Sequence, residues 1–430
     1  MHALIDFHSD RADHAHAPAR EAQTRWALAP IAQRLTFVRE LRHLIAENSD
    51  ALAAAAASVN NRPLAEKLVS EVLPLADACR WLEKSAARVL APRRAGNRGR
   101  PFWLRGFSFA VERQPFGLVL VIGPGNYPLF LPAVHSLHAL VAGNAVLLKP
   151  APGTRNVAQI FAKLAGAAGL DPALLTILPE GVAAARAAIA AGVDKVVFTG
   201  SSENGRDVLA DLAPTNTPAV MELSGEDAVL VLADADLDLV VRALGFGARL
   251  NNGQTCIAPR RLIVVQSVAD DLLARLATAR IPTLLIDRVR DEAAAVLRTN
   301  AADFALGASI FSRDVARARS LAARIKTGFV LINDLIAPTA DPRLPFGGVK
   351  ASGFGTTRGD EGLLEMTFPH VVGVRSGGSH PHFDESDADD GKFFSSYIRA
   401  AHGRRGTRIS AIRDFIGALI GKIKNRKTNS

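Results

Sequence analysis

The feature that most constrains the fold is an alternation of short apolar segments with helical ones between residues 116 and 212. The segments FGLVLVIGP, NAVLLKP and KVVFTGS have the length and composition of buried strands, and the segments between them have helical periodicity. Strands that are apolar on both faces and separated by helices are expected to be parallel, with helices on both sides of the sheet. The sequence therefore predicts an α/β fold with a Rossmann-type doubly wound sheet, whose ligand binds beyond the carboxyl ends of the strands.

Two regions extend this core. Residues from about 26 to 90 contain helical patterns, so we place the nucleotide-binding domain at 26–223, with short strands near 102–114. The second half alternates more loosely, with strand-like AVLVLAD, RRLIVVQ and GFVLIND. This pattern predicts a second α/β domain over 224–345, followed by a return segment over 346–373.

Both ends of the chain are predicted to lie outside these domains. The polar, histidine-containing residues 1–25 predict a disordered tail, and the Gly-, Ser- and Asp-rich residues 374–392 predict a linker. Residues 393–430 predict a basic amphipathic helical tail, which either packs on protein or lies on an anionic membrane. Its apolar face is expected to contain Ile409, Ile412, Ile416, Leu419 and Ile423.

Composition excludes several classes of protein. The net charge of +9 comes from scattered arginines without a basic stripe interleaved with aromatic residues, so we expect no nucleic-acid binding. The chain lacks an uninterrupted run of 18 apolar residues and a secretory leader, which favours a cytoplasmic protein. Two cysteines, Cys79 and Cys256, are too few for a disulfide framework, and the irregularly spaced histidines predict no metal site.

Two motifs at strand ends are suited to a nucleotide. In VVFTGSSENGRDV, Gly200 and Ser201 lie between a strand and a helix, with Gly205 one turn later, where backbone amides can bind a pyrophosphate. In NAVLLKP, Lys149 ends a strand where a ribose or phosphate of that nucleotide would lie, although a lysine there can also be merely solvated. Each signal is weak by itself.

Three further residues have the chemistry of a covalent mechanism. Cys256 in NNGQTCIAPRR is a nucleophile or an inert buried thiol, and Asn126 in VIGPGNYP is an oxyanion donor or an ordinary turn residue. Glu222 in AVMELSGED lies in an apolar strand, where a carboxylate serves as a general base or forms a buried ion pair. Cys79, in contrast, falls in a helical pattern and is expected to pack in the core.

Taken in order, these motifs resemble those of the NAD(P)-dependent aldehyde dehydrogenase superfamily. The resemblance runs from about residue 60 to 372 through PFGLVLVIGPGNYP, AGNAVLLKP, FTGSSENG, MELSG, NNGQTC and LPFGGVKASGFG. The segment EVLPLADACRWLEKSAARVLAPRR is most similar to the class 3 branch, which includes fatty, aromatic and coniferyl aldehyde dehydrogenases.

The resemblance implies a role for each candidate residue. Cys256 would attack an aldehyde, Asn126 and the Cys256 amide would hold the oxyanion, and Glu222 would activate water. With NAD or NADP as cofactor, Lys149 would bind the adenosine ribose. The pyrophosphate would lie against Gly200, Ser201 and Gly205. Phe346 would line the substrate tunnel. The resemblance also implies a homodimer that exchanges strands drawn from FSFAVERQP and MTFPHVVGVR.

The chain departs from the family pattern in three places. A glutamate that binds the ribose diol is replaced by Pro152, which predicts weaker discrimination against NADP. Several dozen residues are missing after RRLIVVQSVADDLLARL, including a Glu-Glu-x-Phe-Gly-Pro motif near the nicotinamide ribose, so we expect a truncated catalytic domain. Gly125 and Ser224 replace a tryptophan and a glycine, which predicts a reshaped pocket.

Three functions are compatible with this pattern. The first is NAD(P)-dependent oxidation of an aldehyde to a carboxylic acid through a thiohemiacetal and a thioester. The second is a catalytically degenerate binding or interaction protein, which the missing motif favours. The third is an acyl-CoA or acyl-phosphate reductase, which the presence of Glu222 disfavours because such relatives lack the base.

Overall fold

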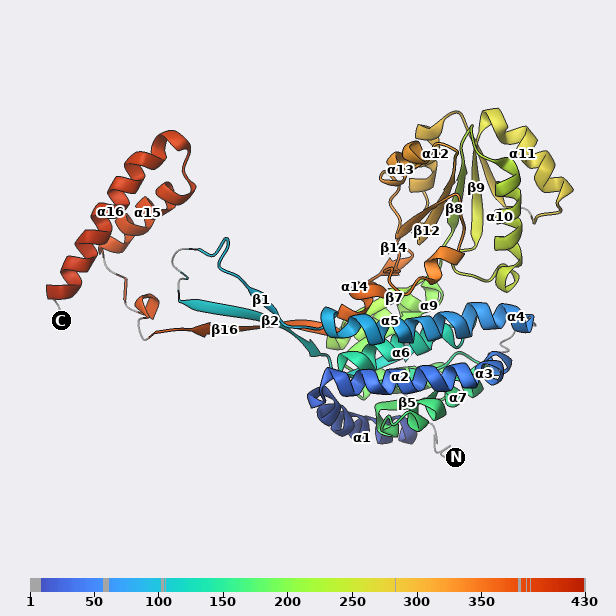
Figure 1. The fold of residues 1–430 in the computed structure, drawn as a ribbon, viewed down its shortest axis with the longest axis horizontal. Helices are drawn as coiled ribbons and strands as arrows, with labels where there is room; N and C mark the ends of the chain where they lie inside the picture. The colour runs from blue at the N-terminus through green and yellow to red at the C-terminus, as the bar shows by residue number, and fades with distance from the viewer. Residues whose placement is uncertain are drawn as a thin grey trace, which may run out of the picture. The chain divides into compact units, whose positions relative to one another are not determined.

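The computed structural model divides the chain into two compact units, shown in Figure 1. One comprises Met1–Ala95 and Phe109–Val372, and the other comprises Gly96–Ser108 and Gly373–Ser430. The structure describes residues 9–56, 62–101, 104, 106–282, 284–377, 380–383, 385–386 and 388–428.

The first sheet has the strand order β15-β7-β6-β3-β4-β5, in which all neighbours are parallel except β15 and β7. Its central strands are fully buried, as their continuous apolar sequence requires, so the predicted doubly wound α/β fold is confirmed. The strands are β3 (Leu118–Ile122), β4 (Ala145–Lys149), β5 (Leu175–Ile177), β6 (Lys195–Thr199), β7 (Ala219–Glu222) and β15 (Gly353–Phe354). The helices between them are α6 (Phe130–Ala142), α7 (Arg155–Ala167), α8 (Val182–Ala190) and α9 (Ser202–Leu212).

The amino-terminal helices pack on this sheet, and the prediction of a disordered tail over 1–25 is wrong for residues 9–25. They belong to α1 (Ser9–Leu28), whose small or apolar residues Ala19, Ala22 and Trp26 recur at helical spacing and are buried. The Trp26 indole donates to the Leu140 carbonyl at 2.7 Å. Residues 1–8 lie outside the described residues. The helices that follow are α2 (Ile31–Glu47), α3 (Ser49–Ala55), α4 (Leu64–Lys67), a π-helical turn (Leu68–Val72) and α5 (Leu73–Val89), which buries Cys79.

A second, five-stranded sheet has the order β10-β9-β8-β12-β13 and is parallel throughout. A short connection links α11 to β10, with Arg280 in the left-handed region at φ 53°, so β9 and β10 form an ordinary parallel pair despite the shortened sequence. The strands are β8 (Asp227–Val231), β9 (Pro259–Val265), β10 (Leu285–Val289), β12 (Gly307–Phe311) and β13 (Phe329–Ile332). The helices are α10 (Leu237–Arg249), α11 (Gln266–Thr278), α12 (Glu292–Asn300) and α13 (Val315–Ala322).

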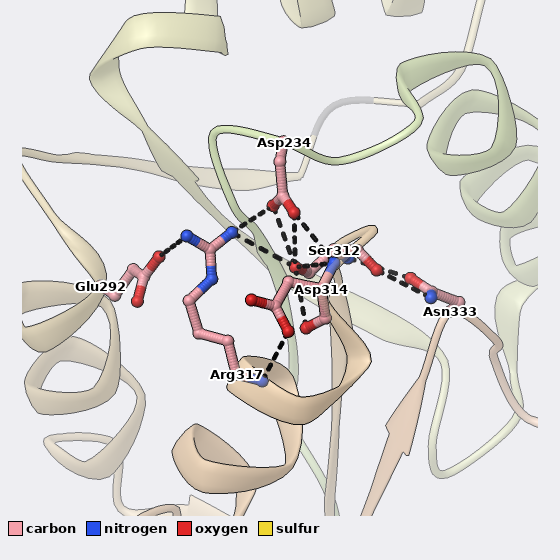
Figure 2. Close-up of polar contacts among 6 residues, drawn as sticks. All are labelled: Asp234, Glu292, Ser312, Asp314, Arg317 and Asn333. Atoms are coloured by element: carbon pink, nitrogen blue, oxygen red, sulfur yellow. Dashed lines mark hydrogen bonds and ion pairs between the residues drawn. The ribbon is translucent and has the colours of Figure 1, made fainter.

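A polar cluster closes the carboxyl end of this second sheet (Figure 2). The Ser312 hydroxyl donates to Asp234 at 2.9 Å, and Arg317 bridges Asp234 at 2.6 Å and Glu292 at 3.1 Å. Asn333 exchanges two hydrogen bonds with the Ser312 backbone, each 2.9 Å long. Because these charges pair with one another, the cluster ties strand ends to helices and has a structural role.

The remaining strands are short or form a third sheet. β11 (Phe304–Ala305) pairs with β14 (Val349–Lys350), and α14 (Gly359–Leu364) follows the return segment. The third sheet has the order β1-β2-β16, from Arg93–Ala95, Phe107–Pro115 and Thr367–Arg375. Strand β2 covers most of the region where strands were predicted near 102–114; residues 102, 103 and 105 lie outside the described residues.

The carboxyl-terminal region differs from the single helix predicted over 393–430. It forms two helices, α15 (Ala388–His402) and α16 (Arg405–Thr428), which lie side by side, and the predicted linker over 374–392 therefore ends earlier. A break at Gly403 and Arg404 separates the helices. On α16 Leu419 is half-buried while Ile420 is exposed, and the side chain of Ile423 is outside the described part.

No helix within the described ranges is long and apolar enough to cross a membrane. Within those ranges, too, no three histidine, cysteine or acidic side chains gather in a way that could hold a metal ion.

Candidate active site

One cavity of about 590 Å³ collects seven of the eight predicted site residues. The carboxyl ends of β3, β4, β6 and β7 contribute Ile122, Lys149, Thr199 and Glu222, their last residues. Cys256 comes from the loop before the amino end of β9. The cavity therefore lies where a doubly wound sheet is expected to bind its ligand. Its predicted lining residues are Asn126, Lys149, Gly200, Ser201, Glu222, Cys256 and Phe346.

Cys256 is positioned by a tight turn. Asn251, Asn252 and Gly253 have left-handed φ values of 50°, 52° and 71°, a conformation that asparagine and glycine tolerate best. The Thr255 hydroxyl and the Tyr127 hydroxyl lie 2.7 Å apart and fasten the turn to the loop after β3. A side chain at Gly225 would come within 2.6 Å of the Cys256 carbonyl oxygen, so only glycine permits this approach.

Asn126 faces the same turn. Its side-chain nitrogen donates to the Gln254 carbonyl at 2.8 Å, and its side-chain oxygen accepts from the Tyr127 amide at 3.0 Å. Its own carbonyl accepts from Asn251 at 2.9 Å. These contacts fix the orientation of the amide group, and its second N–H hydrogen remains for an oxyanion.

Glu222 is buried at the end of β7 among hydroxyl groups and an imidazole. Thr199 donates to one carboxylate oxygen at 3.0 Å, and Thr357 donates to the other. The His135 Nε2 atom lies 3.7 Å from the carboxylate. Burial lowers the pKa of His135, with the charge of Glu222 opposing and that of Arg358 reinforcing the shift, so the imidazole is neutral near pH 7.

Burial raises the pKa of the half-buried Cys256 thiol to about 12. The carboxylates of Glu222 and Asp227 contribute to this raised pKa, while the buried Arg358 guanidinium opposes it. The cysteine is therefore a thiol near neutral pH, and a nearby base has to accept its proton before it can attack.

The other end of the cavity has the features of a nucleotide site. Gly200 and Ser201 precede the amino end of α9, whose N–H groups favour an anion, and Lys149 ends β4 nearby. Burial lowers the pKa of Lys149, and Glu180 opposes the shift. Glu180 is itself engaged, because it accepts a hydrogen bond from the Arg155 amide at 2.6 Å. Pro152 lines the cavity where the resemblance expects a glutamate.

Gly205 does not line the cavity in the way the sequence predicted. It is buried in α9, and a Cβ there would lie 2.6 Å from a Leu223 methyl group and 3.3 Å from Met221. The glycine is required because α9 packs closely on the segment around Glu222. Its position therefore supports the site through packing, and its contact with a pyrophosphate stays a prediction.

Phe346 lines the opposite end of the cavity and is almost fully buried. Its backbone exchanges two hydrogen bonds with Thr357, each 2.7 Å long. Its ring lies 5.5 Å from the Phe329 ring and 4.4 Å from the Arg358 guanidinium carbon. These contacts fix the aromatic wall next to the cysteine and the carboxylate.

Sequence reasoning missed several residues around the site. His135 could have been noticed as one of two histidines in the mainly apolar segment LPAVHSLHALVAG. Arg358 has a left-handed φ of 61°, which no local pattern indicates. Glu71 pairs with Arg62 at 2.7 Å and accepts from the Leu129 and Phe130 amides at the start of α6. A glutamate and an arginine nine residues apart gave no signal of a buried ion pair.

Known proteins are similar to most of the chain. A model of the aldehyde dehydrogenase family matches residues 4–280 and 281–372. The match divides close to the point where the sequence predicts the missing segment. The 4,4'-diapolycopene aldehyde oxidase of Methylomonas sp. is 31% identical over 422 residues, covering 82% of this chain and 79% of the relative. The vanillin dehydrogenase of Pseudomonas fluorescens is 30% identical over 452 residues, covering 86% and 91%.

A solved structure agrees with these relatives. The NAD-dependent aldehyde dehydrogenase from Sinorhizobium meliloti has a TM-score of 0.81 at 25% identity, with 88% of this chain and 89% of that chain covered. Family, fold and the arrangement of motifs in one cavity agree. The chain therefore belongs to the aldehyde dehydrogenase family of NAD(P)-dependent oxidoreductases.

Proposed function

We propose that the protein oxidises an aldehyde to a carboxylic acid with NAD or NADP as hydride acceptor. The observation that supports this most is the convergence of a thiol, an amide donor and a carboxylate on one cavity: Cys256, Asn126 and Glu222. These groups come from separate parts of the chain, and together they supply the nucleophile, the oxyanion donor and the base that the reaction needs.

The chain's own residues would act in the following order. Glu222 accepts the proton of the Cys256 thiol, and the thiolate forms a C–S bond with the aldehyde carbon. The Asn126 side chain and the Cys256 amide donate to the oxygen, which carries the negative charge of the thiohemiacetal. A bound nicotinamide would supply the hydride acceptor for that carbon, and loss of the hydride would leave a thioester on Cys256. Glu222, after releasing its first proton, takes a proton from the attacking water, and the C–S bond breaks.

The residues at the far end of the cavity fit a dinucleotide. The amino end of α9 with Gly200 and Ser201 would hold the pyrophosphate, and Lys149 would hold the adenosine ribose. Glu222 is the sole carboxylate among the cavity-lining residues, and Lys149 and Arg260 are the cations. A 2′-phosphate near Pro152 would meet no carboxylate of the lining, which supports the proposal that NADP is accepted along with NAD.

A direct assay tests the proposed reaction. Purified protein is incubated with NAD or NADP and a panel of aliphatic and aromatic aldehydes while absorbance at the wavelength of the reduced cofactor is followed. We expect reduced cofactor and carboxylic acid in equal amounts, and loss of both in the Cys256→Ala variant. The matched control is Cys79→Ala, because Cys79 is buried in α5 away from the cavity.

The two alternative functions would give different results in this assay. A binding protein without turnover would reduce no cofactor although folded and able to bind NAD. An acyl-CoA or acyl-phosphate reductase would release product only when coenzyme A or phosphate is added. The presence of Glu222 in the same cavity as Cys256 favours hydrolysis by water over both alternatives.

Several finer assignments belong to the same proposal. We infer that the chain is a class 3-type member acting in the cytoplasm, and that two copies form a homodimer through β16. We also infer that the carboxyl-terminal region makes a surface contact, with a membrane or with a partner.

A further inference from the structure

The carboxyl-terminal helices lie beyond residue 372, where the match to the family ends. They form a hairpin with its own small core, in which the Phe415 ring lies 5.1 Å from the Phe393 ring and 5.5 Å from the Tyr397 ring. Ala411 is buried on the same side of α16. Arg408 donates to the Ala400 and Ala401 carbonyls at 3.1 and 3.3 Å. The hairpin is therefore an addition to the family fold, held by contacts of its own.

Outside that core, α16 exposes a row of isoleucines. Ile409, Ile412, Ile416 and Ile420 recur at intervals of three and four residues and so occupy one side of the helix. Their exposed fractions are 78%, 46%, 49% and 49%. Single exposed apolar residues are common, but a row of four large ones along one helix marks an interaction surface.

Positive charge accompanies this row. Residues 388–430 contain ten lysines and arginines and three aspartates, a net charge of +7, compared with +9 for the whole chain. Most of the net positive charge therefore lies near the carboxyl terminus and is not spread evenly along the chain, although arginines occur throughout the sequence. At 3.6 residues per turn, Arg405 and the exposed Arg413 lie close to the isoleucine row, whereas Asp414 lies on the far side of the helix.

We propose that the isoleucine row of α16 docks on the surface of an anionic lipid bilayer. A helix with an apolar row bordered by arginines lies in the plane of the interface, with isoleucines among the acyl chains and guanidinium groups among anionic headgroups. Each cationic side chain near an anionic surface adds to the attraction, which weakens with salt. The absence of a spanning helix from the described ranges agrees with a protein that lies on the membrane and does not cross it.

Cosedimentation of the full-length protein with vesicles tests this proposal. At low salt we expect binding to vesicles of phosphatidylcholine and phosphatidylglycerol at 7:3, no binding to pure phosphatidylcholine, and release of the protein in 0.5 M salt. The double variant Ile412→Ser/Ile416→Ser is expected to bind at least about tenfold more weakly, because two fewer apolar side chains are transferred from water into the bilayer. The variant Arg405→Gln/Arg413→Gln is expected to bind more weakly at low salt. The control Val182→Ser/Leu297→Ser removes apolar side chains that are even more exposed but lie elsewhere, and it is expected to bind like the parent.

Other outcomes overturn the proposal. The proposal is contradicted if the parent protein does not bind anionic vesicles. It is also contradicted if the isoleucine variant has an unchanged circular dichroism spectrum and binds as well as the parent. A lower sedimentation coefficient of the isoleucine variant without vesicles would assign the row to self-association. Binding to soluble polyglutamate but not to vesicles would assign it to an acidic partner protein. The measurement does not depend on turnover, since Cys256→Ala is expected to bind vesicles normally.

Discussion

Asp227 lies outside the lining of the cavity, and we expect it to affect both the stability of the fold and the reactivity of Cys256. It is buried at the start of β8, where it accepts a hydrogen bond from the Gly307 amide at 3.0 Å, and burial raises its pKa to about 7. The folded state favours the protonated carboxyl of Asp227. This residue therefore stabilises the fold most below about pH 4, and its contribution to the free energy of unfolding is lost as the pH rises through about 7.

The difference in stability between the Asp227→Asn variant and the parent should therefore depend on pH. The amide keeps the acceptor for Gly307 without a charge, so at pH 8 its free energy of unfolding is expected to exceed that of the parent by roughly 2–4 kcal/mol. At pH 4 the two should agree. Urea unfolding at pH 4 and pH 8 measures this difference in the free energy of unfolding.

Removal of the negative charge of Asp227 is also expected to lower the pKa of Cys256, so iodoacetamide should alkylate the variant faster than the parent at pH 8.

Pro152 provides a prediction about the cofactor. A carboxylate introduced there would accept hydrogen bonds from a ribose diol and repel a 2′-phosphate. For Pro152→Glu we expect the ratio of kcat/KM for NAD over NADP to rise by at least about tenfold, which corresponds to about 1.4 kcal/mol. Pro152→Gln is the matched uncharged control. An unchanged ratio would show that the proline position lies away from the adenosine ribose.

At the scale of elements, the buried pair of Glu71 and Arg62 joins the π-helical turn to the amino end of α6. Glu71 is fully buried and accepts hydrogen bonds from the Leu129 and Phe130 amides at 3.1 and 2.8 Å, three and four residues after Asn126. Removal of one partner of a buried ion pair leaves an uncompensated charge. For Glu71→Ala we expect a loss of about 3–5 kcal/mol in the free energy of unfolding and lower activity.

Two comparison variants show whether the expected loss of stability comes from the buried ion pair. Glu71→Gln keeps an acceptor for the helix amides and should be less destabilising, while the exposed Glu40→Ala in α2 should change stability by less than about 0.5 kcal/mol. Thermal or urea unfolding followed by circular dichroism measures all three. A loss for Glu71→Ala no larger than for Glu40→Ala would show that the pair contributes nothing.

The elements also show what the sequence could predict. The apolar runs of five residues in β3 and four in β4 identified the parallel sheet, because burial on both faces leaves a continuous local pattern. Helix α1 was missed because its buried alanines are spaced among histidines, aspartates and arginines that read as a tail. The approach of His135 to Glu222 depends on packing between elements 87 residues apart along the chain, which no local pattern encodes.

At the scale of the whole molecule, the third sheet predicts how two copies associate. Strand β16 is the last strand in the order β1-β2-β16, and Phe368, Val371, Val372 and Val374 are exposed along it. An exposed apolar edge strand is a site for pairing with another strand, and charge or proline protects many such edges. In β16, Pro369 precedes the valines and leaves the stretch from Val371 to Val374 without a proline. A second copy that adds its own strand would pair the backbone groups and cover the valines.

Substitution of lysine at two valines on one face of β16 tests this association. For Val372→Lys/Val374→Lys we expect the protein to sediment as a monomer where the parent sediments as a dimer, because like charges would meet across the paired edge. The variant Ile412→Ser/Ile416→Ser should still sediment as a dimer, since its substitutions lie in the hairpin. A monomeric parent would refute the dimer, and a dimeric lysine variant would place the interface elsewhere. If the lysine variant is monomeric but retains kcat, each copy contains a complete active site, as expected when Cys256, Asn126 and Glu222 line one cavity of a single chain.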